Sequence, residues 1–375
     1  MSNTQELLSK FNSIAINPSK QKDAYLAAGE KIVLTAPVYT PEEIIHSMGL
    51  IPMGAWGGTL PLQKSREYFP AFICSIAQSI LELGMNDAFK GASAIVIPPL
   101  CDCLRGLGQN WKYAVPTIPF IPMSYPQNRA NEVGIAFCKA GYERVISDLE
   151  KATGARFDDT ELAKSIQIYN EHNVVMREVD KVLATHPEIS AAQRSSIFKS
   201  AFFIEKGEHT VLVKELLDVL KHISSADAKK IPVMTSGILC DAPDLLEIFD
   251  KVGLQIVADD VAAESRQYRT DAPGTTPALD ALAEKFSRMD NCSVLFDADK
   301  KRADLIVETA KQRGARGVVI VLTKFCPPEE FDYVIIKKAC NAAKLPHVMI
   351  EVDRQMTNYE QARTALETFR DVLQD

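Results

Sequence analysis

Short, nearly continuous apolar runs separated by helical patterns are the feature that most constrains the fold of this chain. Strands with one face in water alternate apolar and polar residues, whereas strands buried on both faces of a parallel sheet form unbroken apolar runs. Helices between such strands cover both faces of the sheet and give a doubly wound α/β layer. We predict a helix over 75–89 and strands at 31–36, 94–98, 117–122, 231–234, 254–258, 293–296, 317–322 and 347–352.

The middle of the chain, over 143–224, shows helical patterns and no strand pattern. Asp158 and Asp159 supply a capping residue and an acidic first turn to the first of its helices. Apolar residues recur on one face of that helix at Leu162, Ile166, Tyr169, Met176, Val179 and Leu183. The predicted fold is therefore of the α/β class, with two doubly wound, Rossmann-like parallel-sheet domains at 1–150 and 227–375 joined by a helical module at 151–226.

A proline followed by acidic residues marks two predicted helix starts. Positions 40–43 read Thr-Pro-Glu-Glu, which predicts Thr40 as the N-cap and Pro41 as the first helical residue. Positions 326–330 read Cys-Pro-Pro-Glu-Glu after the run at 317–322, so a second helix is expected to begin beside Cys326.

The charge balance argues against nucleic-acid and membrane partners. The chain has 375 residues, a net charge of −7 and no dense run of Lys and Arg. Nucleic acids and anionic membranes select basic clusters. No apolar run approaches the roughly 20 residues that span a bilayer, and the N-terminus lacks the basic start and apolar core of a signal peptide. We expect a cytoplasmic protein with no nucleic-acid or membrane partner.

Eight cysteines are present, and in a cytoplasmic chain of this size we expect thiols rather than disulfides. Cys101 and Cys326 each follow a predicted strand, and Cys74 lies where a helix begins. Ligands of open parallel sheets bind beyond the carboxyl ends of the strands, and a helix N-terminus stabilises a thiolate. Thiolates suit zinc or an iron–sulfur cluster. However, no Cys-x-x-Cys motif occurs, so a metal site and three loop cysteines without a ligand both remain open.

The histidines have simpler structural explanations. None adjoins the three cysteines in sequence, so a Cys/His nucleophile pair has little support. We expect His46 to form a local hydrogen bond within its helix, and His172 and His209 to be solvated or to cap helices.

The charged segment after the run at 254–258 has both structural and functional interpretations. Asp260 is expected to N-cap the next helix, while Glu264 could point into the cleft. Arg266 and Arg269 would either bind phosphate or form surface salt bridges. No Gly-x-Gly-x-x-Gly or Walker-type loop is present, which weakens a nucleotide-binding interpretation.

Nine stretches carry a resemblance that spans essentially the whole chain. They are 37–46, 53–58, 68–78, 99–104, 108–112, 125–129, 168–172, 258–266 and 324–330. In these stretches the chain closely resembles the beta subunit of the 2-hydroxyacyl-CoA dehydratases of anaerobic amino-acid fermenters, within the wider 2-hydroxyglutaryl-CoA dehydratase and benzoyl-CoA reductase superfamily.

The resemblance implies an iron–sulfur enzyme of two related subunits. Each subunit would hold a [4Fe–4S] cluster on three cysteines, here Cys74, Cys101 and Cys326, with a non-cysteine ligand on the fourth iron. A related alpha subunit would complete a heterodimer, and a separate ATP-dependent iron–sulfur activator protein would supply one electron. Family members often have cysteine where Thr40 stands and threonine where Cys103 stands.

The implied reaction is that of a carbon–oxygen lyase. An (R)-2-hydroxyacyl-CoA substrate would lose water through a ketyl radical to give an (E)-2-enoyl-CoA. The substrate-binding cluster is attributed to the partner subunit, so the cluster of this chain would relay the electron. The alternatives are a benzoyl-CoA reductase-type subunit and a non-catalytic α/β protein that binds a CoA ester. Lactoyl, 2-hydroxyglutaryl, 2-hydroxyisocaproyl and phenyllactyl groups all remain open.

Overall fold

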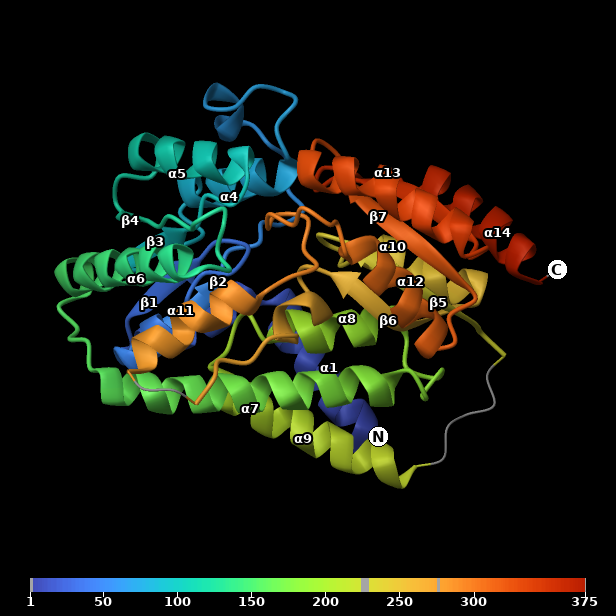
Figure 1. Cartoon of the computed structure of the whole chain (residues 1–375), viewed down its shortest axis with the longest axis horizontal. Coiled ribbons are helices and arrows are strands. Elements are labelled where there is room, and N and C mark those ends of the chain that lie inside the picture. Colours follow the sequence, from blue (N-terminus) through green and yellow to red (C-terminus); the bar gives the residue numbers. More distant parts are fainter. Residues whose placement is uncertain (1–2, 224–228, 275–276, 375) are drawn as a thin grey trace.

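The structure, a computed structural model, describes residues 3–223, 229–274 and 277–374 (Figure 1). Its strands form two four-stranded parallel sheets, one in each half of the chain, with the orders β2-β1-β3-β4 and β6-β5-β7-β8. Numbered within each half, both orders are 2-1-3-4. The strands are β1 (Ile32–Thr35), β2 (Ile51–Gly54), β3 (Ala94–Ile97), β4 (Phe120–Pro122), β5 (Ile231–Gly237), β6 (Leu254–Val261), β7 (Gly317–Thr323) and β8 (His347–Val352).

Helices precede, separate and follow these strands. Those up to β5 are α1 (Asn3–Ile16), α2 (Pro18–Ala27), α3 (Glu42–Ser47), α4 (Ser75–Met85), α5 (Asp102–Ala114), α6 (Glu132–Thr153), α7 (Asp159–Leu183), α8 (Ala191–Ser200) and α9 (Lys206–His222), with the 3₁₀ helix η1 (Lys64–Glu67). The later ones are α10 (Pro243–Val252), α11 (Ala278–Arg288), α12 (Arg302–Gln312), α13 (Pro327–Ala342) and α14 (Glu360–Gln374), with η2 (Ser265–Tyr268).

The first sheet is buried on both faces, as its unbroken apolar strands predict. Leu34 of β1 packs in one core with residues of α4 and α5, whereas its neighbour Val33 packs in a second core with residues of α3, α6 and α11. Helix α11 comes from the last third of the chain, so a distant segment completes the core of the first sheet (Figure 1).

The second sheet repeats this arrangement. Val319 of β7 belongs to the large core that also contains Leu34, whereas Ile320 packs in a third core with residues of α12 and α13. The two sheets therefore share one continuous apolar core. The predicted fold class, with two doubly wound Rossmann-like sheets and helices between them, is confirmed.

Helix α7 connects the two halves. It contacts α3 and α11 beside the first sheet and β6 and η2 beside the second, and it runs along one side of the molecule (Figure 1). As predicted, Asp158 caps it by accepting a 2.7 Å hydrogen bond from the backbone N–H of Thr160. From 143 to 223 every regular element is helical. The predicted domain boundaries remain predictions, and the boundary at 226/227 lies outside the described residues.

Seven of the eight predicted strands are present, and one is wrong. Segment 293–296 forms a turn in which Leu295 is buried in the second core without any strand pairing. Strand β2 was not predicted because Pro52 interrupts its pattern. It is an edge strand, where proline is tolerated because no ladder hydrogen bond from that residue is needed.

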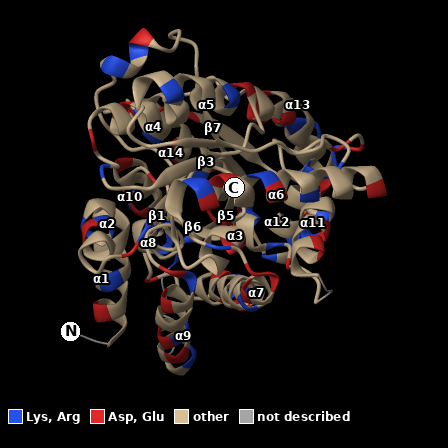
Figure 2. Cartoon of the chain, turned by 90° about the vertical axis from the view of Figure 1, so that its left-hand side faces the viewer, with Lys and Arg blue, Asp and Glu red and all other residues tan. Residues whose placement is uncertain are grey.

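Charged residues of both signs are interspersed over the side of the molecule that Figure 2 shows. No helix in the described ranges combines the length and apolar character needed to cross a bilayer.

Candidate functional site

Three helices begin at a cysteine. Cys74, Cys101 and Cys326 are the N-cap residues of α4, α5 and α13, respectively. The free N–H groups of a helix's first turn stabilise negative charge at this position. The nearby backbone N–H groups of Ala77, Leu104 and Glu329 act to lower the pKa of Cys74, Cys101 and Cys326, respectively, against the larger opposing effects described below. Each thiolate therefore has an electrostatically favourable place at the end of a helix.

These cysteines lie close enough to influence one another. Burial, and then the charge of the neighbouring Cys103, raise the pKa of Cys74 to about 11. The pKa of Cys326 is also well above its usual range, because of burial and then of the charge on Cys74. Cys74, Cys103 and Cys326 belong to the apolar core that both sheets share, and Cys101 packs against it.

Cys101 and Cys103 form a pair of unequal thiols. The thiol of Cys101 donates a hydrogen bond to Cys103, which raises the pKa of Cys101 well above its usual range and lowers the pKa of Cys103 to about 6. Cys103 is thus the more easily ionised of the two in the absence of metal.

The donor set fits an iron–sulfur cluster. Among the described residues, no three His, Cys, Asp or Glu side chains meet as ligands of a single metal ion. In a [4Fe–4S] cluster each cysteine binds a different iron, so its ligands need not converge on one point. Cys74 and Cys326 are 8% and 9% exposed, and burial disfavours a thiolate that has no nearby positive charge. Bound iron would supply that charge.

A network of buried charges fixes the start of α13 behind Cys326. Arg302 donates to Glu329 at 2.9 Å and to Asp260 at 2.8 Å, and Arg266 bridges the same two carboxylates at 3.3 Å and 3.1 Å. Burial alone would raise the pKa of Asp260, but Arg266 and Arg302 lower it, so the carboxylate stays ionised.

Two predictions about this charged segment are wrong. Asp260 is not an N-cap: it lies in β6 and is fully buried. Arg266 is 3% exposed and forms no surface salt bridge. Glu264 is directed to Arg194, in a second buried ion-pair cluster. These charges are buried because partners from distant segments neutralise them.

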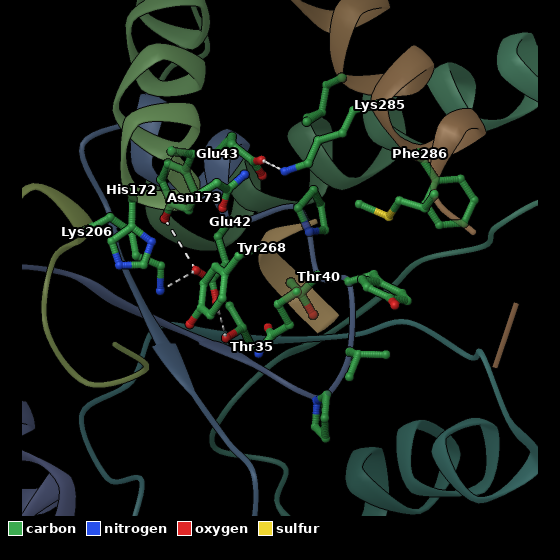
Figure 3. Close-up of a pocket in the computed structure, with 18 of the residues that line it drawn as sticks. Thr35, Thr40, Glu42, Glu43, His172, Asn173, Lys206, Tyr268, Lys285 and Phe286 are labelled. Carbon is green, nitrogen blue, oxygen red and sulfur yellow. Dashed lines mark hydrogen bonds and ion pairs between the residues drawn. The ribbon is translucent and has the colours of Figure 1, made fainter. Parts of the chain in front are cut away.

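A cavity of about 80 Å³ opens beyond the carboxyl end of β1 (Figure 3). Glu42 lies in its wall and pairs with Lys206 at 3.0 Å, while Thr35 and Tyr169 donate to the same carboxylate at 3.3 Å and 3.5 Å. We call this space the strand-end cavity. Its lining residues include Glu42, Glu43, Trp56, His172, Lys206, Gln267, Leu282, Lys285, Phe286 and Met289.

A second ion pair connects the two halves at the cavity wall. Lys285 of α11 lies 2.6 Å from Glu43 of α3, and these side chains are 10% and 6% exposed. The expected N-cap at Thr40 is wrong: Pro41 occupies that position, while the hydroxyl of Thr40 donates to the carbonyl of Ala36 at 2.8 Å.

The histidine predictions are also wrong. His172 and His209 are neither solvated nor capping, but 1% and 0% exposed and hydrogen-bonded to each other at 3.0 Å. His46 bonds outside its own helix, to Ser165 at 2.9 Å and Glu205 at 3.1 Å. No sequence motif marks these contacts, because each joins segments far apart in the chain.

Comparisons with known proteins agree over the full length of the chain. Residues 37–373 match the family model described as "2-hydroxyglutaryl-CoA dehydratase, D-component". The chain is 43% identical to the (R)-phenyllactyl-CoA dehydratase beta subunit of Clostridium sporogenes and 38% identical to the lactoyl-CoA dehydratase subunit beta of Anaerotignum propionicum, over 100% of each chain. It is 35% identical to the (R)-2-hydroxyglutaryl-CoA dehydratase subunit beta of Acidaminococcus fermentans, over 98% of this chain and 99% of that one. The chain therefore belongs to the 2-hydroxyglutaryl-CoA dehydratase D-component family.

Proposed function

We propose that this chain is the beta-type subunit of a 2-hydroxyacyl-CoA dehydratase, a hydro-lyase that converts an (R)-2-hydroxyacyl-CoA to the (E)-2-enoyl-CoA. The observation that carries the proposal is a full-length match to dehydratase beta subunits in a chain where three neighbouring helices begin at cysteine. The family match supports the reaction class, and the cysteines support the cofactor.

Cys74, Cys101 and Cys326 would hold a [4Fe–4S] cluster, which supplies one-electron transfer when bound. The helix N-termini offset the negative charge of the cluster and its thiolates. Burial keeps water from the sulfurs of Cys74 and Cys326, and the ion pairs of Glu329 fix the helix that presents Cys326.

In the proposed reaction, one electron added to the thioester carbonyl gives a ketyl that expels the neighbouring hydroxide. Loss of the C3 proton and return of the electron give the 2-enoyl-CoA, so the net change is loss of water. The electron comes from an ATP-dependent iron–sulfur activator, and a related alpha subunit completes a cytoplasmic heterodimer.

Anaerobic purification of this chain co-expressed with its alpha subunit tests the proposal. We expect about four irons and four sulfides on this chain, and water loss from one or more of the lactoyl, phenyllactyl, 2-hydroxyglutaryl and 2-hydroxyisocaproyl thioesters when activator, ATP and reductant are present. A preparation that contains iron and sulfide but dehydrates none of them would refute the proposed reaction.

Analysis of the product distinguishes the proposed dehydratase from a benzoyl-CoA reductase-type subunit. Net uptake of two electrons by an aromatic thioester would support the reductase. Loss of water without net reduction supports the dehydratase.

A further inference from the structure

We propose that Arg354 is a positioning residue of the cysteine site: it fixes the start of α4, and with it Cys74, relative to the start of α13, where Cys326 is the N-cap. The inference rests on the proposed function, because it concerns cysteines proposed there as cluster ligands, and it adds a residue outside that ligand set. Three features support it: the division of the ligands between the two halves, the contacts of Arg354, and the short connection from Arg354 to Cys326.

The proposed ligands come from both halves of the chain. Cys74 and Cys101 begin α4 and α5, which pack against each other in the first half, whereas Cys326 begins α13 in the second half. Distances between a metal and its ligands vary by only about 0.2 Å. A cluster held by both halves therefore needs contacts that fix one half against the other close to the cysteines.

The backbone of Arg354 contacts the start of α4. Arg354 lies in the loop after β8 and is 8% exposed. Its N–H donates a 3.0 Å hydrogen bond to Oγ of Ser75, the first residue of α4, which directly follows Cys74. A buried N–H that loses its acceptor costs free energy, so this bond favours one placement of the two segments. A residue of the second half is thus bound one position beyond Cys74.

The guanidinium of Arg354 connects two further segments. It donates to the carbonyl oxygen of Trp56 at 3.2 Å and to the two carboxylate oxygens of Asp241 at 2.8 Å and 3.2 Å. Trp56 lines the strand-end cavity and belongs to the first half, whereas Asp241 follows β5 in the second half. The planar guanidinium presents these donors as a rigid fork, which the single ammonium of a lysine does not provide. The side chain of Arg354 therefore also joins the two halves.

The carboxylate of Asp241 is itself held in place. Lys199 of α8 donates to it at 2.9 Å from the side opposite the arginine's chain segment. Burial alone would raise the pKa of Asp241, but the charges of Arg354 and Lys199 lower it below its usual range, so the carboxylate stays ionised. Hydrogen bonds between ionised groups are stronger than neutral ones, so Asp241 is a firm anchor for the guanidinium.

The connection from Arg354 to Cys326 is short. Val352, the last residue of β8, pairs with Thr323, the last residue of β7. The N–H of Lys324 then donates to the carbonyl oxygen of Val352 at 3.0 Å. Arg354 and Cys326 follow this paired point by two and three residues, respectively. The parallel ladder therefore transmits the position of Arg354 to the start of α13.

S75A breaks the connection without changing any charge or any proposed ligand, because it removes the acceptor of the Arg354 N–H. Its matched control is S79A. Ser79 is also fully buried in α4, but its hydroxyl donates at 3.0 Å to the carbonyl oxygen of Ile76 in the same helix.

R354M removes the guanidinium, and R313M is its matched control. Arg313 also joins a carboxylate and a backbone carbonyl, those of Asp180 at 2.9 Å and Val257 at 3.0 Å. However, it lies just before β7, at the opposite end of that strand from Cys326. If R354M does not fold, S75A and S79A still test the inference.

The rate of iron release to a chelator measures how firmly the cysteine site is held. The anaerobically purified heterodimer is mixed with a ferrous-iron chelator, and the chelated iron is followed by absorbance. We expect S75A and R354M to release about four irons about tenfold faster than wild type, and S79A and R313M to match wild type. The electron paramagnetic resonance signal of the reduced cluster should broaden in S75A and R354M alone. The alpha subunit is unchanged in every variant, so its iron is a constant background.

Hydrogen exchange followed by mass spectrometry examines the same connection without iron. S75A should speed exchange in residues 353–356, because the N–H of Arg354 loses its acceptor. R354M should speed exchange at the start of α4. S79A should leave residues 353–356 unchanged, and R313M should leave both segments unchanged.

The outcomes separate this inference from the proposed function. Equal iron release and exchange in S75A and S79A, or in R354M and R313M, overturn the role of Arg354 and leave the dehydratase function intact. A wild-type heterodimer without iron in this chain refutes the proposed cofactor, and the exchange data then decide by themselves whether Arg354 fixes the start of α4.

Discussion

Cys101 and Cys326 occupy equivalent places in the two sheets: each is the N-cap of the helix that follows the third strand of its sheet. Since both sheets have the order 2-1-3-4, these third strands, β3 and β7, each lie beside the first strand of their sheet. The two halves thus contribute matched cysteines to one site, while Cys74 comes from the first half alone.

Substitutions at the paired thiols should have opposite outcomes. We expect C101S to lose most of the iron and sulfide of this chain and its absorbance near 400 nm, because Cys101 is the N-cap of α5 and a helix N-terminus stabilises a thiolate ligand. C103T should retain the cluster, since threonine preserves the size of a residue that the site does not use as a ligand. Iron and sulfide analysis of anaerobically purified heterodimer measures both. If C103T loses the cluster and C101S keeps it, the ligand assignment passes to Cys103.

Removal of Arg302 should strongly destabilise the second half. R302L leaves Asp260, Glu329 and Asp332 without a cationic partner that lies 2.8–3.0 Å from each. Breaking one partner of a buried ion pair costs about 3–5 kcal/mol, and denaturant unfolding measures the loss.

The matched control for Arg302 is a lysine on the surface. Lys251 pairs with Glu247 on α10, and these side chains are 52% and 61% exposed. Because water screens such a pair, K251M should leave the free energy of unfolding almost unchanged. Equal effects of R302L and K251M would show that the buried network contributes no more than a surface pair.

Sequence predicts a residue's place well where local pattern decides it. Cys101 and Cys326 are placed correctly at strand ends because an apolar run and a following helix start define the position. Segment 293–296 fails because Leu295 satisfies its hydrophobicity by packing in a turn, which an apolar run alone does not distinguish from a strand.

Sequence does not predict the place of a side chain where its burial depends on a partner that is distant in the chain. Asp260 is neutralised by Arg302, which is 42 residues away. His172 is hydrogen-bonded to His209, which is 37 residues away. A charged or imidazole side chain is expected to be in water unless its partner is known, and no local pattern names that partner. The cavity was missed for this reason: its polar wall is assembled from α3, α7, α9 and η2.

Gly57 should not tolerate a side chain. Its φ is +74°, and a Cβ there would lie 2.1 Å from Oγ of Ser79 on α4. We expect G57A to destabilise the protein by about 1–3 kcal/mol through steric overlap and a strained backbone. At the neighbouring Gly58 a Cβ would meet nothing closer than 3.9 Å, so G58A is the matched control. Thermal melts compare the two, and equal melting temperatures would contradict the packing of the Trp56 loop on α4.

The buried histidine pair should make folding stability depend on pH. The pKa of His209 is about 3 and that of His172 is also lowered, whereas in the unfolded chain both lie near 6.5. As pH falls below about 6.5, the unfolded state binds protons that the folded state does not, so stability present above this pH is lost. At pH 5.5 the loss is about 1.4 kcal/mol for each histidine. In the double variant H172F/H209F both partners become apolar, so this contribution disappears while all carboxylates titrate as before. The difference in free energy of unfolding between wild type and variant, followed from pH 8 to 5.5, should therefore shift by about 3 kcal/mol, and a constant difference would mean that the histidines are protonated in the folded protein.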